Sequence, residues 1–362
     1  MRVAVVILNW NTKDYLRKFL PPLLESVSGF NGGGEGFAEV AVADSASTDG
    51  SMEMMAAEFP QVRRIPLDRN YGFTGGYNRA LGKLSEESGF DLYVLLNSDI
   101  EVTPGWLGPL VRWMEEHPEC GACGPKLHSW HERDKFEYAG AAGGLLDRFG
   151  YPFCRGRVLG KVETDRGQYD SPADVLWVTG ACLAVRSDVW DSLGGLDSRF
   201  FAHMEEIDLC WRMQLEGWKV TVVPQSLVYH LGGGTLPQNS PQKLYLNYRN
   251  NLLMLDNNLA RTVGRRKAAL RIFFRKILDG CSAAVYLLSF RTEYFKAVWR
   301  AHRDAAELTA KRRRENVAEG SAGRSAADMD SEGSKVHGLY GGCMIPRALL
   351  GMKIVFSEQN EA

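Results

Sequence analysis

The chain has 362 residues, of which 45% are hydrophobic and 24% charged, and its formal net charge is −1. That length allows one large domain or two smaller ones. The near-neutral charge gives no overall electrostatic reason to expect binding to nucleic acid or membranes. Seven cysteines, an odd number in a long chain, do not indicate a secreted disulfide scaffold. Because we find no signal-peptide pattern and no apolar stretch long enough to span a bilayer, we expect a cytoplasmic protein.

Apolar runs and amphipathic stretches alternate through the first third of the chain and predict its secondary structure. The predicted buried strands are Val3–Leu8, Glu39–Ala43, Arg63–Pro66 and Leu92–Leu96. The predicted helices are Lys13–Val27, Thr48–Phe59 (capped by Thr48 or Asp49), Gly72–Leu84 and Trp106–His117, with a glycine-rich loop over Gly29–Gly36. This alternation is typical of an α/β fold with a doubly wound, mostly parallel sheet, in which ligands bind outside the carboxyl ends of the strands.

The rest of the chain is less regular. Residues 120–240 combine short strands and glycine-rich turns with a strong predicted helix near Glu205–Gly217. Residues 242–310 are predicted to be helical and basic. Residues 315–335 contain almost no large apolar residue, which is typical of a disordered linker.

Polar residues follow the predicted strands where a parallel sheet would place its ligand. The fourth strand runs into Asn97-Ser98-Asp99, and a carboxylate there can hold a divalent cation that bridges two phosphates. A single strand-end aspartate is more often a cap or turn residue, so this signal alone is weak. Asn9 and Asn11 follow the first predicted strand, and Asp44 follows the second. Asn70, Gly75 and Asn78 lie around the start of the third predicted helix, and all six are further candidates.

An acidic segment precedes the apolar part of the predicted helix near residue 205. Glu205 and Asp208 are three residues apart and share a helix face, whereas Glu206 points elsewhere. A carboxylate in the first helical turn can act as a general base. It can also simply complement the helix dipole, and this segment alone does not decide between the two interpretations.

Read together, six ordered segments resemble glycosyltransferase family 2, in its bacterial rhamnosyltransferase-like branch. The resemblance covers about residues 1–255 and is carried by these segments: Val5-Val6-Ile7-Leu8-Asn9-Trp10-Asn11, Asp44 with Ser47-Thr48-Asp49-Gly50, Asn70-Tyr71-Gly72-Phe73 with Gly75-Gly76-Tyr77-Asn78, Leu96-Asn97-Ser98-Asp99, Val178-Thr179-Gly180-Ala181-Cys182, and Glu205-Glu206-Ile207-Asp208-Leu209-Cys210-Trp211-Arg212.

The resemblance implies a GT-A catalytic domain over residues 1–255. Composition predicts a basic amphipathic helical extension over 256–314 and a disordered linker and tail over 315–362. The resemblance also implies inverting, Mg²⁺- or Mn²⁺-dependent transfer from a UDP- or dTDP-sugar to a glycan or polyprenyl-linked acceptor. Glu206, with Glu205 second and Asp208 as a helper, would supply the base, and Asp99 with His230 would hold the metal. The donor would contact the following residues: Asn9, Asn11, Asp44, Asn70, Gly75, Asn78, Asn97, Ser98 and Arg249. Glu206 stands where the family usually has Asp, and Asn97 replaces the first Asp of its metal motif.

Two other classes of function can be weighed. A catalytically inactive nucleotide-sugar-binding protein of the same fold would be consistent with Glu206. A nucleotidyltransferase would need a glycine-rich basic loop after the first strand, and Asn9-Trp10-Asn11-Thr12 supplies none. Basic and apolar residues are interleaved between Arg261 and Arg314, which indicates either peripheral contact with a membrane or helices packed on the catalytic domain. No nucleic-acid recognition motif accompanies this charge.

Overall fold

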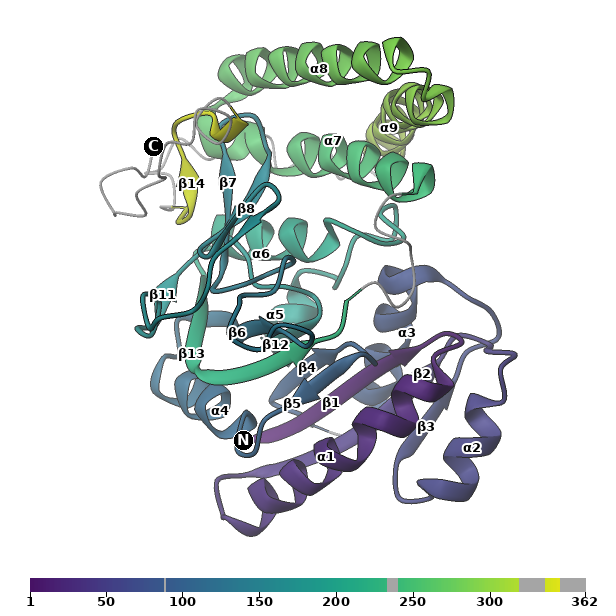
Figure 1. The fold of residues 1–362 in the computed structure, drawn as a ribbon, viewed down its shortest axis with the longest axis vertical. Helices are drawn as coiled ribbons and strands as arrows, with labels where there is room; N and C mark the ends of the chain where they lie inside the picture. The colour runs from purple at the N-terminus through teal and green to yellow at the C-terminus, as the bar shows by residue number, and fades with distance from the viewer. Residues whose placement is uncertain (88, 233–239, 319–335, 346–362) are drawn as a thin grey trace.

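The computed structural model describes residues 1–87, 89–232, 240–318 and 336–345. Its main sheet has the strand order β11-β13-β6-β12-β4-β1-β2-β3, with β5 paired to β13 (Figure 1). Four strands from the first third of the chain pair in parallel: β1 (Arg2–Asn9), β2 (Phe37–Asp44), β3 (Arg63–Pro66) and β4 (Leu92–Leu96). These are the strands that the sequence predicts, and the α/β fold is confirmed.

Side chains of β1 alternate between two apolar cores, one on each face of the sheet. Val3, Val5 and Ile7 pack with helices α1 (Lys13–Gly32), α2 (Ser51–Glu58) and α4 (Leu107–Glu116). Ala4 and Val6 pack with α3 (Gly72–Glu87) and with α6 (Glu205–Leu215) and α7 (Pro241–Val263). Burial on both faces explains why the strand reads as a continuous apolar run.

The second half of the sheet is mixed rather than parallel. Strand β12 (Cys182–Arg186) runs antiparallel to β4 and to β6 (Cys120–Ser129), and β13 (Lys219–His230) is parallel to β6. The edges are completed by β5 (Ile100–Val102) and β11 (Ala173–Asp174), and α5 (Ser187–Ser192) follows β12. A smaller sheet contains β7 (Gly144–Asp147), β8 (Pro152–Cys154), β9 (Arg157–Val158), β10 (Lys161–Val162) and β14 (Leu339–Tyr340).

Three C-terminal helices stand beside the small sheet. Helices α7, α8 (Arg265–Leu288) and α9 (Thr292–Ala318) contact one another, and α8 lies at the outer edge of the molecule with α7 between it and α6 (Figure 1). In α8, Arg275 forms a buried ion pair with Asp279 at 2.8 Å. None of the helices in the described ranges combines the length and apolarity that crossing a membrane requires.

Several predicted boundaries need correction. Helix α1 continues to Gly32 and takes up the first part of the predicted loop over Gly29–Gly36. Helix α2 begins at Ser51 after Gly50, whose φ is +76°, so neither Thr48 nor Asp49 is the cap. Asp49 instead accepts hydrogen bonds from the backbone N–H groups of Lys13 (2.9 Å) and Ser51 (3.0 Å).

The predicted division after residue 255 falls inside α7, which is continuous from Pro241 to Val263. Part of the predicted disordered tail is also ordered: α9 reaches Ala318, and β14 pairs in parallel with β7. Of the remainder of that tail, residues 319–335 and 346–362 lie outside the described residues.

Candidate active site

The ends of β1 and β2 are locked together by buried side chains. Asn9 and Asp44 are opposite each other in the parallel register, and the Asn9 amide donates to the Asp44 carboxylate at 2.6 Å. The Asn9 carbonyl oxygen accepts from the Thr12 hydroxyl at 2.6 Å, so this fully buried amide is used within the protein. Asn11 holds the loop after β2 by accepting from the N–H of Thr48 at 2.8 Å. Asn9 and Asn11 therefore fix the loops that follow β1 and β2, and Asp44 takes part through its hydrogen bond from Asn9.

Asp99 and His230 meet because β5 pairs with the end of β13. Asp99 directly precedes β5, and His230 is opposite Ile100 in that pairing. The His230 Nε2 atom is 3.2 Å from the Asp99 carboxylate, and His230 Nδ1 is 3.5 Å from Glu137. Burial favours neutral forms, but the hydrogen bonds and charges of Asp99 and Glu137 outweigh it and raise the pKa of His230 to about 10. Burial likewise opposes ionisation of Asp99, yet the hydrogen bond from His230 leaves its pKa below the usual value.

A short series of contacts connects the segment around Asp99 to the start of α6. The N–H of Asn97 donates to the carbonyl of Ala181 at 2.9 Å, in the segment that leads into β12. Next to Ala181, Gly180 faces both Phe73 and Glu206, and a methyl group built on it would lie 3.5 Å from the Glu206 Cβ atom. The side chains of Asn97 and Ser98 are half-buried at this edge. The structure thus brings the predicted metal residues and the predicted base to one edge of the sheet.

The carboxylates of Glu205 and Glu206 are presented by a strained turn. Phe201, His203 and Met204 all have positive φ, at 66°, 72° and 72°. This left-handed conformation is costly for residues other than glycine and persists only where the surroundings enforce it. Helix α6 begins directly after the turn.

The environments of the two glutamates differ. Glu205 is buried and Glu206 is half-buried, and each has a carboxylate oxygen without a hydrogen-bond partner among the described residues. Burial raises the pKa of Glu206, and burial together with the charge of Glu206 raises that of Glu205 well above the usual value.

Two residues of α7 hold the strained turn in place. The amide of fully buried Asn250 donates to three carbonyl groups of the turn, those of Phe200 (2.9 Å), Ala202 (2.7 Å) and His203 (2.7 Å). Arg249 also donates to the Phe200 carbonyl, at 2.7 Å, and to that of Arg199 at 3.2 Å. Arg249 was predicted to contact the donor, but its guanidinium is used here on the turn. Asn250 is the main support of the turn, although it was not among the site residues predicted from the sequence.

Asp208 is a completely buried anchor for α6. Its carboxylate pairs with Arg212 at 2.8 Å and accepts from the amides of Asn257 (2.7 Å) and Asn258 (2.8 Å). Arg212 in turn donates to the carbonyls of Leu193 and Gly195. Asp208 therefore lies outside the reacting centre and orients Arg212 and the helix.

The residues around the start of α3 have mainly structural contacts. Asn70 accepts from the N–H of Gly72 at 2.7 Å, which forms a tight turn into the helix. Gly75 lies against Tyr71, because a methyl group built on it would be 2.8 Å from the Tyr71 Cβ atom. Asn78 donates to and accepts from the backbone of Leu196, at 2.7 and 2.9 Å. Asn78 thus fixes a loop 118 residues away and is not free to contact a donor in this arrangement.

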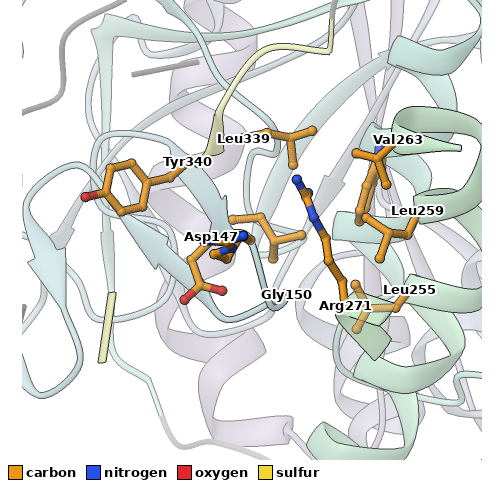
Figure 2. A pocket seen from close by; sticks show the side chains of 11 residues that line it. Asp147, Gly150, Leu255, Leu259, Val263, Arg271, Leu339 and Tyr340 are labelled. Carbon is orange, nitrogen blue, oxygen red and sulfur yellow. The ribbon is translucent and has the colours of Figure 1, made fainter. Parts of the chain in front are cut away.

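A pocket lies apart from these residues. Figure 2 shows Arg271 of α8 reaching between Leu339 and the leucines of α7, with Asp147 and Tyr340 on the other side. The pocket is bounded by α7, α8 and the small sheet, and none of the candidate site residues lines it.

Comparison with known proteins shows which family the chain resembles. Residues 4–159 match the family model described as "Glycosyl transferase family 2". A curated relative from Mycobacterium tuberculosis, an N-acetylglucosaminyl-diphospho-decaprenol L-rhamnosyltransferase, is 28% identical over 242 residues, which cover 63% of this chain and 75% of the relative. The first part of the chain is thus similar to glycosyl transferase family 2. In this glycosyltransferase the matched residues include Asp44 and Asp99 but end before Glu206 and His230, and its relatives include rhamnosyltransferases.

Solved structures share the fold of this glycosyltransferase. The Staphylococcus aureus TarS fragment 1–349 in complex with UDP-GlcNAc has a TM-score of 0.54 at 14% identity, and the match covers 85% of this chain and 83% of that one. GalNAc-T7 with UDP, GalNAc and Mn²⁺ has a TM-score of 0.52 at 16% identity, covering 71% of this chain and 48% of that one. At these identities the likeness shows the GT-A fold.

One signal in the sequence could have indicated the role of α7. Asparagines occur in pairs at residues 250–251 and 257–258, in a helix that is otherwise largely apolar on its inner side. A spacing of seven residues places both pairs on the same helix face. Buried amides on such a face require hydrogen-bond partners, so their presence predicts polar contacts across the core.

Proposed function

We propose that this glycosyltransferase moves a sugar from a nucleotide diphosphate to an acceptor hydroxyl with inversion at the anomeric carbon. The observation that carries the proposal is the placement of two different acidic groups at one sheet edge. Asp99 with His230 lies at the end of β4, and Glu206 lies beside Gly180 at the start of α6. A single displacement needs one group that stabilises the leaving phosphate and another that accepts the acceptor's proton.

The residues around Asp99 suit a divalent cation. Asp99 offers a hard carboxylate oxygen, and His230 offers an imidazole nitrogen once a bound cation displaces the proton that its raised pKa retains. The described residues include no group of three His, Cys, Asp or Glu side chains that could hold a metal by themselves. Mg²⁺ and Mn²⁺ commonly use one or two protein carboxylates and take further ligands from substrate phosphates. A cation held by Asp99 and His230 would neutralise the charge that develops on the departing nucleotide diphosphate.

Glu206 is the side chain that we assign as the base. It is half-buried and adjoins Gly180, whereas Glu205 is buried more deeply and has the more strongly raised pKa. A base must be ionised to accept a proton and must reach the hydroxyl to hydrogen-bond distance. The more accessible and more easily ionised carboxylate meets both requirements better.

Donor and acceptor are inferred from the relatives. A UDP- or dTDP-sugar is the proposed donor, and the proposed acceptor is a glycan or a polyprenyl-linked saccharide used in cell-surface polysaccharide synthesis. The name of the mycobacterial relative, which specifies a decaprenol-linked acceptor, supports the lipid-linked class. Such an acceptor is held at a membrane, so we also infer a cytoplasmic protein in peripheral contact with the inner face of the cytoplasmic membrane.

The experiment is a donor screen followed by product analysis. Purified protein is heated with each UDP- and dTDP-sugar, with Mg²⁺, Mn²⁺ or EDTA present, and a donor at about one hundred times its Kd should stabilise it by about 2.7 kcal/mol. The best donor is then tested for transfer, and NMR of the product gives its anomeric configuration. Asp99→Ala should abolish metal-dependent stabilisation and transfer. Retention of the donor's anomeric configuration, or full transfer in EDTA, would contradict the proposal.

A further inference from the structure

Helix α8 has two unlike sides. Toward the rest of the protein it presents Ala268, Arg275, Asp279 and Ala283, all buried. With 3.6 residues per turn, the opposite side carries large apolar residues that remain exposed. These are Leu270 (57% exposed), Phe273 (58%), Phe274 (46%), Ile277 (45%) and Leu288 (79%), and we call them the apolar face of α8.

The exposed charge on α8 itself has one sign. Exposed basic residues border it at Arg266, Lys267 and Lys276. The only acidic residue of α8, Asp279, is fully buried and pairs with Arg275 at 2.8 Å and His302 at 3.2 Å. Asp279 is therefore neutralised inside the protein, and the outward charge of α8 is positive.

The turn after α8 adds a further exposed aromatic group. Phe290 has a φ of +58° and is 92% exposed, and Arg291 follows it. A bulky residue in the left-handed region costs conformational energy, and solvent exposure of its ring returns none of that cost. The left-handed backbone ends α8, where the N–H of Arg291 donates to the carbonyl of Tyr286 at 2.9 Å, and it leaves the Phe290 ring as additional exposed apolar surface.

An exposed apolar patch of this kind marks an interaction site. We propose that the apolar face of α8, with Phe290, docks on an anionic lipid surface, apolar side chains entering the interface and Arg266, Lys267 and Lys276 meeting the headgroups. Apolar and basic residues divided in this way are typical of helices that lie in a membrane interface. A second copy of the chain fits the face less well, because a two-fold contact would bring the same positive residues together.

The inference deepens the proposed function, since it rests on the lipid-linked acceptor class and names the surface that would bring the enzyme to it. Binding and transfer can nevertheless be measured separately. If vesicle binding is found and no donor sugar is transferred, the docking face stands and the proposed function fails. If transfer to a water-soluble acceptor is found and vesicles are not bound, the docking face fails and the proposed function stands.

The test is co-flotation of the full chain with vesicles of phosphatidylcholine containing phosphatidylglycerol, beside vesicles of phosphatidylcholine alone. The wild type should float with the anionic vesicles and detach at high salt. The double variant Phe273→Ser/Phe274→Ser should bind the anionic vesicles at least about tenfold more weakly than the wild type, because two half-exposed rings no longer enter the interface. Lys267→Glu/Lys276→Glu should weaken binding to the anionic vesicles and reduce its dependence on salt.

Matched controls lie on strands away from α8. Phe37 is 48% exposed in β2 and Lys161 is exposed in β10, so Phe37→Ser and Lys161→Glu should bind vesicles as the wild type does. Equal flotation of wild type and both double variants would overturn the proposal, as would flotation of none of them. Analytical ultracentrifugation covers the remaining occupant: a wild-type dimer that becomes monomeric in Phe273→Ser/Phe274→Ser, without vesicle binding, would assign the face to a second copy instead.

Discussion

Replacing Asn250 by alanine should uncouple the turn that carries the glutamates from the helix that restrains it. The change removes three hydrogen bonds of 2.7 to 2.9 Å. Arg249 continues to donate to the Phe200 carbonyl, so the carbonyls of Ala202 and His203, both half-buried residues, lose Asn250 as a partner. The amide has two N–H groups to share among the three carbonyls, so at about 1 kcal/mol for each N–H the loss is about 2 kcal/mol.

The loss is comparable to the strain that the bonds oppose. Three residues of the turn have positive φ, each at a cost of about 1 kcal/mol or more. Without Asn250 the turn should relax, and the carboxylate of Glu206 should leave its position beside Gly180. We expect turnover to fall about ten- to hundredfold, since each 1.4 kcal/mol corresponds to a factor of ten. The KM for the donor, which does not depend on this turn, should change little.

The neighbouring asparagine provides a matched control. Asn251 is equally buried but bonds to the carbonyl of Gly150 and to Arg275, away from the turn. Asn251→Ala should therefore lower the melting temperature without a selective loss of kcat. Adding Met204→Gly to Asn250→Ala should recover part of the turnover, because glycine adopts the left-handed region without strain. Unchanged kcat in Asn250→Ala, or an equal loss in Asn251→Ala, would refute the reasoning.

Three further changes test other parts of the site. Glu206→Gln should reduce turnover by orders of magnitude with little effect on donor binding in a thermal-shift assay, whereas an active Glu206→Gln beside an inactive Glu205→Gln would reverse the assignment. Since burial raises the pKa of both glutamates, wild-type turnover should fall on acidification at a pH above the usual glutamate value of 4.5. The two glutamates contribute fully to folding stability below pH 4.5, and this contribution is lost as the pH rises through their raised pKa. The pH dependence of the free energy of unfolding should therefore flatten in Glu205→Gln. Gly72→Ala should impair turnover and stability, because the φ of Gly72 is +70° and the new methyl group would lie 2.5 Å from Phe201 in the strained turn. Its control is Gly82→Ala, in open space on the same helix, which should stabilise the protein by about 1 kcal/mol in thermal unfolding. Asp208→Asn should destabilise by about 3 kcal/mol in urea titration, since it removes a fully buried carboxylate and leaves the half-buried Arg212 without its ion pair. An unchanged midpoint would contradict that role.

The parts of this protein that depend on local pattern could be predicted from its sequence. The run Val3–Leu8 is apolar because it is buried on both faces, and Asp99 follows a buried strand, so its place at the sheet edge comes from topology alone. The helix near Glu205 was expected for the same kind of reason, and the structure starts α6 at that residue.

Contacts between distant segments could not be predicted in this way. Asn250 reaches carbonyl groups 47 to 50 residues earlier in the chain, and Asn78 pairs with a backbone 118 residues later. Residue type indicates that a buried amide needs a partner, but only the packing of α7 on the turn says which one. For Arg249, residue type suggested a phosphate contact, but in the structure its guanidinium donates to backbone carbonyls.

The late strand β14 has a consequence for how the chain folds. It completes the small sheet beside β7, and the N–H of Met344 donates to the Asp147 carboxylate across 197 residues of sequence. Contacts of such separation form slowly, because the entropy of closing the loop must be overcome before any pairing stabilises it. During synthesis, Asp147 leaves the ribosome long before its partner exists. The β7 edge of the small sheet therefore stays open to pairing with other chains until residues 339 and 340 have been made.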